Sequence, residues 1–445
     1  MDNRPEFHWG VATSAQQTEG FPDFQGRTPS IWDVFAEKKR KITGGHRPDQ
    51  ATEFFRYYRE DVALAARLGI PNLRFSISWP RVKPNGYGKT NENGLDFYDR
   101  LTDACLEFGI TPWVTLYHWD LPQILQDKGG WVNRDVLGWF EDYSGSVLKR
   151  LSDRVVHWMS LNEPLAFTGA GYFLGIHAPG KTGLSNFLPA MHHAILAQAD
   201  GIRQIKSYKS NLIAGTTFSC APVVPDSSNP KDQGAALRAD ALFNRLFVEP
   251  LIGYGYPIKE LSFLRKVGKW MMAGDESRMI ALPSFIGLQN YTRETVKHVW
   301  WVPYLQAKKT ENSSNPRNKT MIGWDIYPEG LYQMIHKFSA YPEIKSVIVT
   351  ENGAAFPDQV DAGRVNDKMR ISYLDQYISA TLKARAEGAK VNGYFAWSLT
   401  DNFEWSEGYF PRFGLTHINY ATQRRTIKDS GFWYGDYIRK QTQST

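Results

Sequence analysis

The sequence predicts an α/β fold in which eight parallel strands close into a (β/α)8 barrel. Short apolar runs alternate along the chain with amphipathic helical patterns, which is typical of repeated βα units. Eight such runs lie between residues 7 and 399, and eight is the number of strands in this kind of barrel. The 445 residues fit one barrel with long loops, so we expect residues 1–445 to form a single domain.

The eight expected strands are short and apolar. We place them at Phe7–Ala12, Asn72–Ile77, Thr111–Leu116, Val155–Leu161, Asn211–Phe218, Phe285–Tyr291, Ser346–Thr350 and Gly393–Leu399. No Pro/Ser/Gly-rich linker divides them, and the sequence has no internal repeat of fixed period. These observations favour one continuous barrel.

Two of the intervening helices show clear amphipathic spacing. Between residues 93 and 108 apolar side chains recur at three- and four-residue intervals, at Leu95, Tyr98, Leu101, Cys105 and Phe108. Gly109 follows as the expected C-terminal cap, and Asp61–Gly69 repeats the pattern just before the second strand. The polar segment Tyr304–Met321 predicts a long surface loop, either part of a substrate entrance or a solvated connection.

Composition argues against several classes of protein. The net charge of +6 comes without a dense basic tract, so we expect no nucleic-acid partner. No apolar stretch approaches 18 residues and the N-terminus lacks a signal-peptide pattern, so we expect no membrane partner. Two cysteines, Cys105 and Cys220, are too few for a disulfide framework, which favours a reducing, cytoplasmic location.

Cofactor motifs are also missing from the sequence. It has no H-E-x-x-H motif and no cysteine cluster, so no metal is expected. No G-x-G-x-x-G loop follows a predicted strand, so we expect no nucleotide cofactor either. The expected partner is a small molecule, and the oligomeric state stays open.

Two glutamates end predicted strands. Glu163 lies in S-L-N-E-P, where Pro164 stops the strand, and Glu351 lies in V-T-E-N-G, where we expect Gly353 to supply turn geometry. In a parallel barrel the functional face lies at the carboxyl ends of the strands, so both carboxylates should reach one cavity. Such a pair is the minimal apparatus for breaking a glycosidic bond.

Further side chains suited to sugar binding follow the other strands. They are Gln16, Gln17, Glu19, Arg74, His118, Trp119, Asp120, Asn162, Tyr291, Trp397, Asp401, Asn402, Glu404 and Trp405. Amides, carboxylates and an imidazole can share hydrogen bonds with sugar hydroxyls, and Trp rings cover the apolar face of a pyranose. Each residue alone has an ordinary explanation, such as core packing for a Trp. Their coincidence at the same ends of many strands favours a common site.

An ordered series of segments resembles glycoside hydrolase family 1, the β-glucosidase family, over essentially the whole chain. The segments are F-H-W-G-V-A-T-S-A-Q-Q-T-E-G (Phe7–Gly20), S-I-W-D (Ser30–Asp33), R-F-S-I-S-W-P-R (Arg74–Arg81), T-L-Y-H-W-D-L-P (Thr115–Pro122), S-L-N-E-P, H-A-P-G (His177–Gly180), V-T-E-N-G, W-S-L-T-D-N-F-E-W (Trp397–Trp405) and R-F-G-L (Arg412–Leu415). The resemblance implies a single-domain (β/α)8 TIM barrel that hydrolyses terminal β-D-glycosides with retention of configuration.

The resemblance also implies the roles of individual residues. Glu163 matches the acid/base position and Glu351 the nucleophile, two carboxyls that stand about 5 Å apart in retaining enzymes. Arg74 should keep Glu351 ionised, and Tyr291 should steady it. The expected substrate-binding residues are Gln17, His118, Trp119, Asn162, Trp397, Glu404, Trp405 and Phe413. Glu404 stands where a phosphoglycosidase branch has a phosphate-binding segment, so an unphosphorylated sugar is expected.

Four positions depart from the family pattern, namely Gln16, Ser284, Gln289 and Tyr377. None is one of the two catalytic carboxylates. β-Glucosidase is the leading hypothesis. The alternatives are β-galactosidase, β-fucosidase or transglycosidase activity at the same site, a non-catalytic sugar-binding barrel, and a barrel enzyme of unrelated chemistry.

Overall fold

Eight parallel strands form a closed barrel in this computed structural model, which describes residues 5–20, 24–310 and 318–443. The strands are β1 (His8–Ala12), β2 (Asn72–Ser76), β3 (Thr111–Tyr117), β4 (His157–Asn162), β5 (Ile213–Ser219), β7 (Phe285–Gln289), β10 (Val347–Asn352) and β11 (Val391–Trp397). Their order around the barrel is β1-β11-β10-β7-β5-β4-β3-β2. The predicted barrel is confirmed, and each strand overlaps its predicted range.

The strand register brings the predicted site residues to one rim. Ala12 of β1 lies opposite Arg74 of β2, and Glu351 of β10 lies opposite Gln289 of β7. Gly353 follows β10, and a Cβ there would stand 2.0 Å from the Trp397 carbonyl oxygen. The prediction of turn geometry was wrong, because Gly353 forms no turn and its φ is not positive. The glycine instead permits close approach of the β10 and β11 ends.

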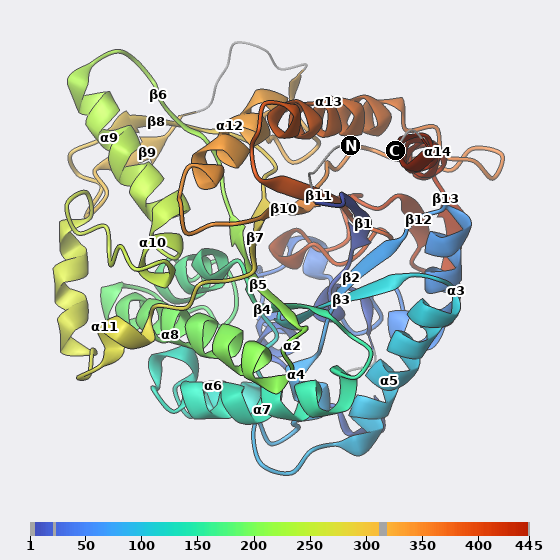
Figure 1. Ribbon diagram of the computed structural model, residues 1–445, viewed down its shortest axis with the longest axis horizontal. Coiled ribbons are helices and arrows are strands. Elements are labelled where there is room, and N and C mark those ends of the chain that lie inside the picture. Colours follow the sequence, from blue (N-terminus) through green and yellow to red (C-terminus); the bar gives the residue numbers. More distant parts are fainter. Residues whose placement is uncertain (1–4, 21–23, 311–317, 444–445) are drawn as a thin grey trace.

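Two apolar layers hold the barrel. A buried cluster of side chains from five strands fills its interior: Trp113, Met159, Phe285, Ile348 and Phe395. A larger core lies between the strands and the outer helices. The longer helices ring the strands (Figure 1) and are α3 (Phe54–Arg67), α5 (Glu92–Glu107), α7 (Val136–Leu151), α8 (Leu184–Tyr208), α12 (Pro328–Ser339), α13 (Lys368–Ala386) and α14 (Asp429–Gln443).

Both predicted helices are present. In α5 the residues Leu95, Tyr98, Leu101 and Cys105 are buried, Phe108 is partly buried, and Gly109 takes a φ of +71°. The segment predicted from Asp61 belongs to α3, which begins earlier, at Phe54. The aromatic pair Phe54 and Phe55 is buried and extends the apolar face by two turns.

The predicted loop Tyr304–Met321 is only partly irregular. Ala307–Lys309 forms β9, which pairs with β8 (Glu294–His298), and β8 pairs with β6 (Val223–Pro225). This small sheet lies with α9 (Pro230–Asp240) to one side of the barrel (Figure 1). β9 consists of one buried alanine and two exposed lysines, so its composition gave no strand signal. Residues 311–317 lie outside the described part of the chain.

Shorter elements complete the fold. They are α1 (Ala15–Thr18), α2 (Ile31–Ala36), α4 (Trp79–Val82), α6 (Gln123–Asp127), α10 (Val248–Leu251), α11 (Asp275–Arg278), the antiparallel pair β12 (Thr416–Asn419) and β13 (Arg424–Ile427), the π-helices η4 (Ala166–Phe173) and η5 (Ala241–Arg245), and the 3₁₀ helices η1 (Phe24–Gly26), η2 (Thr43–Gly45), η3 (Gly130–Val132), η6 (Ser262–Lys269) and η8 (Trp405–Glu407). Cys105 and Cys220 are buried free thiols. Every helix in the described ranges is too short or too polar to cross a membrane.

Candidate active site

A cavity of about 320 Å³ opens at the carboxyl ends of the barrel strands. Ten predicted site residues line it: Gln17, His118, Trp119, Glu163, Tyr291, Glu351, Trp397, Glu404, Trp405 and Phe413. Arg74 and Asn162 have fully buried side chains that contact these residues from below. The strand ends therefore gather the predicted residues in one place.

Glu351 is surrounded by hydrogen-bond donors. The Arg74 guanidinium contacts its Oε1, and the Gln289 amide donates to the same oxygen at 2.7 Å. The Tyr291 hydroxyl donates to Oε2 at 2.7 Å. Burial raises the pKa of the Glu351 carboxyl, and the Arg74 charge with the Tyr291 hydrogen bond opposes that rise. The pKa of Glu351 stays above its ordinary value of 4.5, and the Arg74 charge and the Tyr291 donor are the groups that stabilise its carboxylate form.

Glu163 has a less polar environment. Burial raises the pKa of Glu163 to about 8, and the negative charge of Glu351 adds to that rise. A hydrogen bond with the Ser219 side chain opposes it. The backbone of Glu163 has a φ of +43°, a left-handed conformation that costs a non-glycine residue about 1–3 kcal/mol. Glu163 lines the cavity from this strained turn, and its raised pKa favours the protonated form of the carboxyl.

Asn162 organises the floor of the site. Its Oδ1 accepts hydrogen bonds from Arg74 at 2.6 Å, from Gln289 at 2.7 Å and from Thr217 at 2.8 Å. With Oδ1 so engaged, Nδ2 must face His118 Nε2, 3.0 Å away. The His118 proton therefore sits on Nδ1, which has no protein partner in the structure. Burial lowers the pKa of His118 well below its usual value, so the ring is a neutral donor.

Glu404 contacts two further side chains that line the cavity. The Trp397 indole donates to its Oε1 at 3.2 Å and the Gln17 amide to its Oε2 at 3.4 Å. Burial raises the pKa of Glu404 to about 8, and the Glu351 charge also contributes. Below that pH the carboxyl is mostly neutral, so charge repulsion from Glu404 is a weaker barrier to a phosphate than the sequence suggested.

Aromatic rings form one wall of the cavity. The Trp119 and Trp405 ring centroids are 4.4 Å apart, and Trp405 also packs on Trp32 at 4.7 Å. Trp119 and Trp405 have φ values of +75° and +53°, so three lining residues, with Glu163, hold left-handed backbone. Phe413 packs near Tyr291 on another side, with centroids 6.1 Å apart. These rings offer flat apolar surfaces beside the carboxyls.

Several strand-end residues do not reach the cavity. Glu19 pairs with Arg81 at 2.8 Å, and Asp120 accepts from the Trp79 backbone at 3.2 Å. Asp401 is bound by Lys428 at 2.6 Å. Asn402 accepts from Gln17 at 3.0 Å and thus supports a cavity residue from behind. These positions have structural roles.

The departures from the family pattern fall in different environments. Gln289 contacts Glu351 directly, whereas Gln16 turns away, binding Asp33 at 2.9 Å and accepting from Arg27 at 3.1 Å. Ser284 accepts from the Ala214 backbone at 3.3 Å, just before β7. Tyr377 accepts from the Tyr327 backbone at 2.9 Å. Of the four, only Gln289 touches one of the two predicted catalytic carboxyls.

Further lining residues were not predicted. They are His177, Ser219, Ile322, Trp324, Ser406, Glu407 and Pro411. His177 lies in a quoted motif, and the strand-end rule applied to β5 would have found Ser219, its last residue. The others lie on loops whose place in space no local pattern specifies. No group of three or more His, Cys, Asp or Glu in the described ranges is arranged to hold a metal ion.

The comparisons with known proteins agree with this geometry. A sequence model described as glycosyl hydrolase family 1 matches residues 2–443. The chain belongs to glycosyl hydrolase family 1. It is an O-glycosyl hydrolase, as the resemblance implied.

Relatives of this glycosyl hydrolase match it from end to end. Beta-glucosidase A of Acetivibrio thermocellus is 39% identical over 444 residues, which are 98% of this chain and 97% of that protein. The bifunctional beta-D-glucosidase/beta-D-fucosidase of Bifidobacterium breve is 37% identical, covering 97% of each. The solved structure of beta-glucosidase from Thermotoga maritima in complex with deoxynojirimycin has a TM-score of 0.94, at 39% identity and 98% coverage of each chain.

Proposed function

We propose that this family 1 member is a retaining β-glucosidase whose residues 1–445 act as one catalytic unit. The observation that carries the proposal is the contrast between two carboxyls in one cavity. Glu351 has donors on both oxygens, whereas Glu163 has a pKa raised to about 8. A nucleophile and an acid need these opposite starting charges.

In the first step Glu351 attacks the anomeric carbon and the bond to the departing oxygen breaks. Glu163 gives its proton to that oxygen, and a covalent glycosyl ester forms on Glu351. The ester removes the charge of Glu351, so the pKa of Glu163 falls. Glu163 then takes a proton from water, which attacks the same carbon, releases the sugar and restores both carboxyls.

The remaining cavity residues suit a pyranose before the scissile bond. The His118 ring and the Glu404 carboxyl line the cavity and offer polar groups to hydroxyls. The Trp397 ring, which also lines the cavity, supplies a platform. The named activities of the relatives support glucose as the sugar, with fucose second through the Bifidobacterium breve relative. We propose that the sugar carries no 6-phosphate, because no Lys or Arg lines the cavity within the described ranges.

The test is chemical rescue of Glu351→Ala. The variant should lose activity on an aryl β-glucoside by about 10⁴-fold or more, since no covalent intermediate can form. A small anion such as azide should restore cleavage and give the α-glycosyl product, because it enters from the face that Glu351 occupied. NMR of the product identifies the anomer. Wild-type rate in the variant would rule out Glu351 as the nucleophile.

A further inference from the structure

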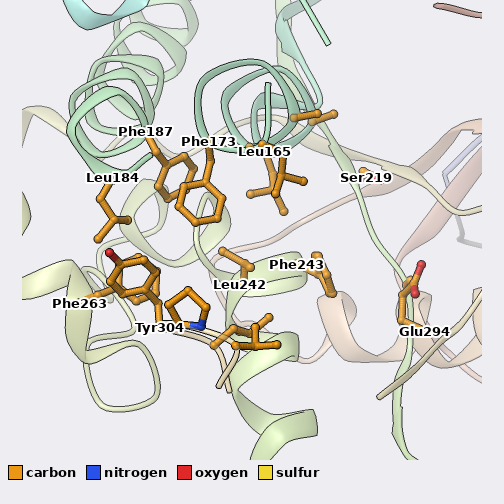
Figure 2. A pocket seen from close by; sticks show the side chains of 18 of the residues that line it. Leu165, Phe173, Leu184, Phe187, Ser219, Leu242, Phe243, Phe263, Glu294 and Tyr304 are labelled. Carbon is orange, nitrogen blue, oxygen red and sulfur yellow. The ribbon is translucent and has the colours of Figure 1, made fainter. Parts of the chain in front are cut away.

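A second cavity, of about 480 Å³, adjoins the catalytic one. Ser219 lines both cavities and hydrogen-bonds to Glu163 through its side chain. Figure 2 shows Ser219 on one side of the second cavity, with Leu184 and Phe263 on the opposite side and Leu165 and Phe173 between them. The cavity thus extends away from the proposed acid.

The lining of this cavity is almost entirely apolar. Its side chains include Leu165, Phe173, Phe187, Leu242, Phe263 and Leu305. Glu294, the one charged lining residue in the described part of the chain, is paired with Lys309 at 2.9 Å. A second sugar placed here would leave hydroxyls without partners, at a cost in free energy, whereas a hydrocarbon group would lose nothing.

The position of the cavity specifies which part of a substrate reaches it. Leu165 follows Glu163 by two residues, and Glu163 is the group that protonates the departing oxygen in the proposed mechanism. A group attached to that oxygen leaves on this side of the site. The cavity therefore faces the aglycone.

Apolar side chains at the edge of the cavity are exposed. Leu174 is 56% exposed and Tyr304 45% exposed, and both belong to the lining. A volume of 480 Å³ falls within the range of about 300–1,000 Å³ typical of small-molecule sites. Removing this surface from water would favour binding of an apolar ligand.

We propose that the second cavity binds an aliphatic chain carried by the aglycone, so that alkyl β-glucosides are a preferred substrate class. This inference rests on the proposed β-glucosidase function. The mixed leucine and phenylalanine lining, extended away from Ser219, suits a flexible chain that continues from the glycosidic oxygen. Leu242 of η5 is a specificity-determining residue that lies apart from the catalytic groups.

The experiment compares methyl, butyl, hexyl and octyl β-glucosides below their micelle concentrations. From butyl to octyl, kcat/KM of the wild-type protein should rise roughly two- to fourfold per methylene, as expected for hydrocarbon transfer out of water. Leu242→Gln should flatten this rise and leave methyl glucoside and cellobiose unaffected. Leu237→Gln is the matched control, because Leu237 is a 62% exposed leucine on α9 that does not line the cavity.

The outcomes separate the two proposals. If kcat/KM does not change with chain length while methyl glucoside and cellobiose are cleaved, the alkyl site is wrong and the β-glucosidase proposal stands. An unchanged rise in Leu242→Gln, or an equal loss in Leu237→Gln, would also overturn the assignment of this cavity. Failure to cleave any glucoside would instead contradict the proposed function.

Discussion

Gln289 donates a hydrogen bond of 2.7 Å to Oε1 of Glu351, the oxygen that also meets the Arg74 guanidinium. The same amide nitrogen donates to Asn162 at 2.7 Å. The residue thus links the proposed nucleophile to the floor of the site, at one of the four positions that depart from the family pattern. It is a positioning residue that acts through Glu351.

Replacing Gln289 with leucine should lower kcat/KM for an aryl β-glucoside by about 10- to 100-fold, the usual range for a hydrogen bond to a charged group. The lost donor favoured the ionised carboxyl, so the pKa of Glu351 should rise and the acidic limb of the pH profile should move to higher pH. Gln198→Leu is the control, since Gln198 is buried and binds Thr216 at 3.2 Å outside the cavity. The control should change stability without moving the profile, and equal movement in both would contradict the role.

Removal of the proposed acid should depend on the leaving group. In Glu163→Ala, kcat/KM should fall by about 10³-fold for an alkyl glucoside and by about tenfold or less for a dinitrophenyl glucoside, which departs without a proton. Steady-state rates across a series of leaving-group pKa values provide the measurement. Equal losses across the series would exclude an acid role for Glu163.

The activity of the wild-type protein should fall as the pH rises through about 8, where Glu163 loses its proton. Glu163→Gln should abolish this basic limb on an activated substrate, whereas Glu404→Gln should keep it although Glu404 also has a pKa raised to about 8. Ser219→Ala should move the limb upward, because the Ser219 hydrogen bond lowers the pKa of Glu163. If the basic limb persists in Glu163→Gln, a group other than Glu163 causes it.

Stability should follow the same proton. The folded pKa of Glu163 is above its ordinary value of 4.5, so the folded state binds this proton more tightly than the unfolded state. The stability that this proton contributes is present at acid pH and is lost as the pH rises from about 4.5 to about 8. The Tm of Glu163→Gln, relative to that of the wild type, should therefore be a few degrees higher at pH 8 than at pH 5. A constant difference in Tm across this range would contradict the raised pKa.

Phosphorylated substrates should react poorly. The cavity lining holds Glu163, Glu351, Glu404 and Glu407 and, within the described residues, no Lys or Arg to pair with a phosphate. An aryl β-glucoside should exceed its 6-phosphate in kcat/KM by about 10³-fold or more. Comparable rates would require a cationic contact that this cavity lacks.

Sequence alone predicted the barrel and both carboxyls because the signals are local. An apolar run indicates a buried strand, and Pro164 indicates where β4 has ended. The parallel topology then brings strand ends together whatever their separation in sequence. Asp401 and Asp120 show the limit of the rule, because a residue after a strand can turn toward a buried cation or a backbone amide instead.

Contacts between distant segments could not be read in the same way. The link from Gln289 to both Glu351 and Asn162 depends on the spacing of β4, β7 and β10. The apolar cavity is assembled from η4, η5, η6, α8 and the chain near Tyr304, segments that lie far apart in the sequence. Strand β9 could not be predicted from the sequence either, because two of its three residues, Lys308 and Lys309, are exposed and polar.

Ser219 marks a boundary with an evolutionary consequence. On one side, the carboxyls and their donors stand on barrel strands or directly after them, where a small backbone shift would misplace them. On the other side, the apolar cavity is built largely from peripheral helices and a loop that carry none of those groups. Substitutions there can retune which leaving group is accepted while the bond-breaking chemistry is inherited intact. In this way, proteins that descend from one barrel scaffold can differ in substrate and share a mechanism.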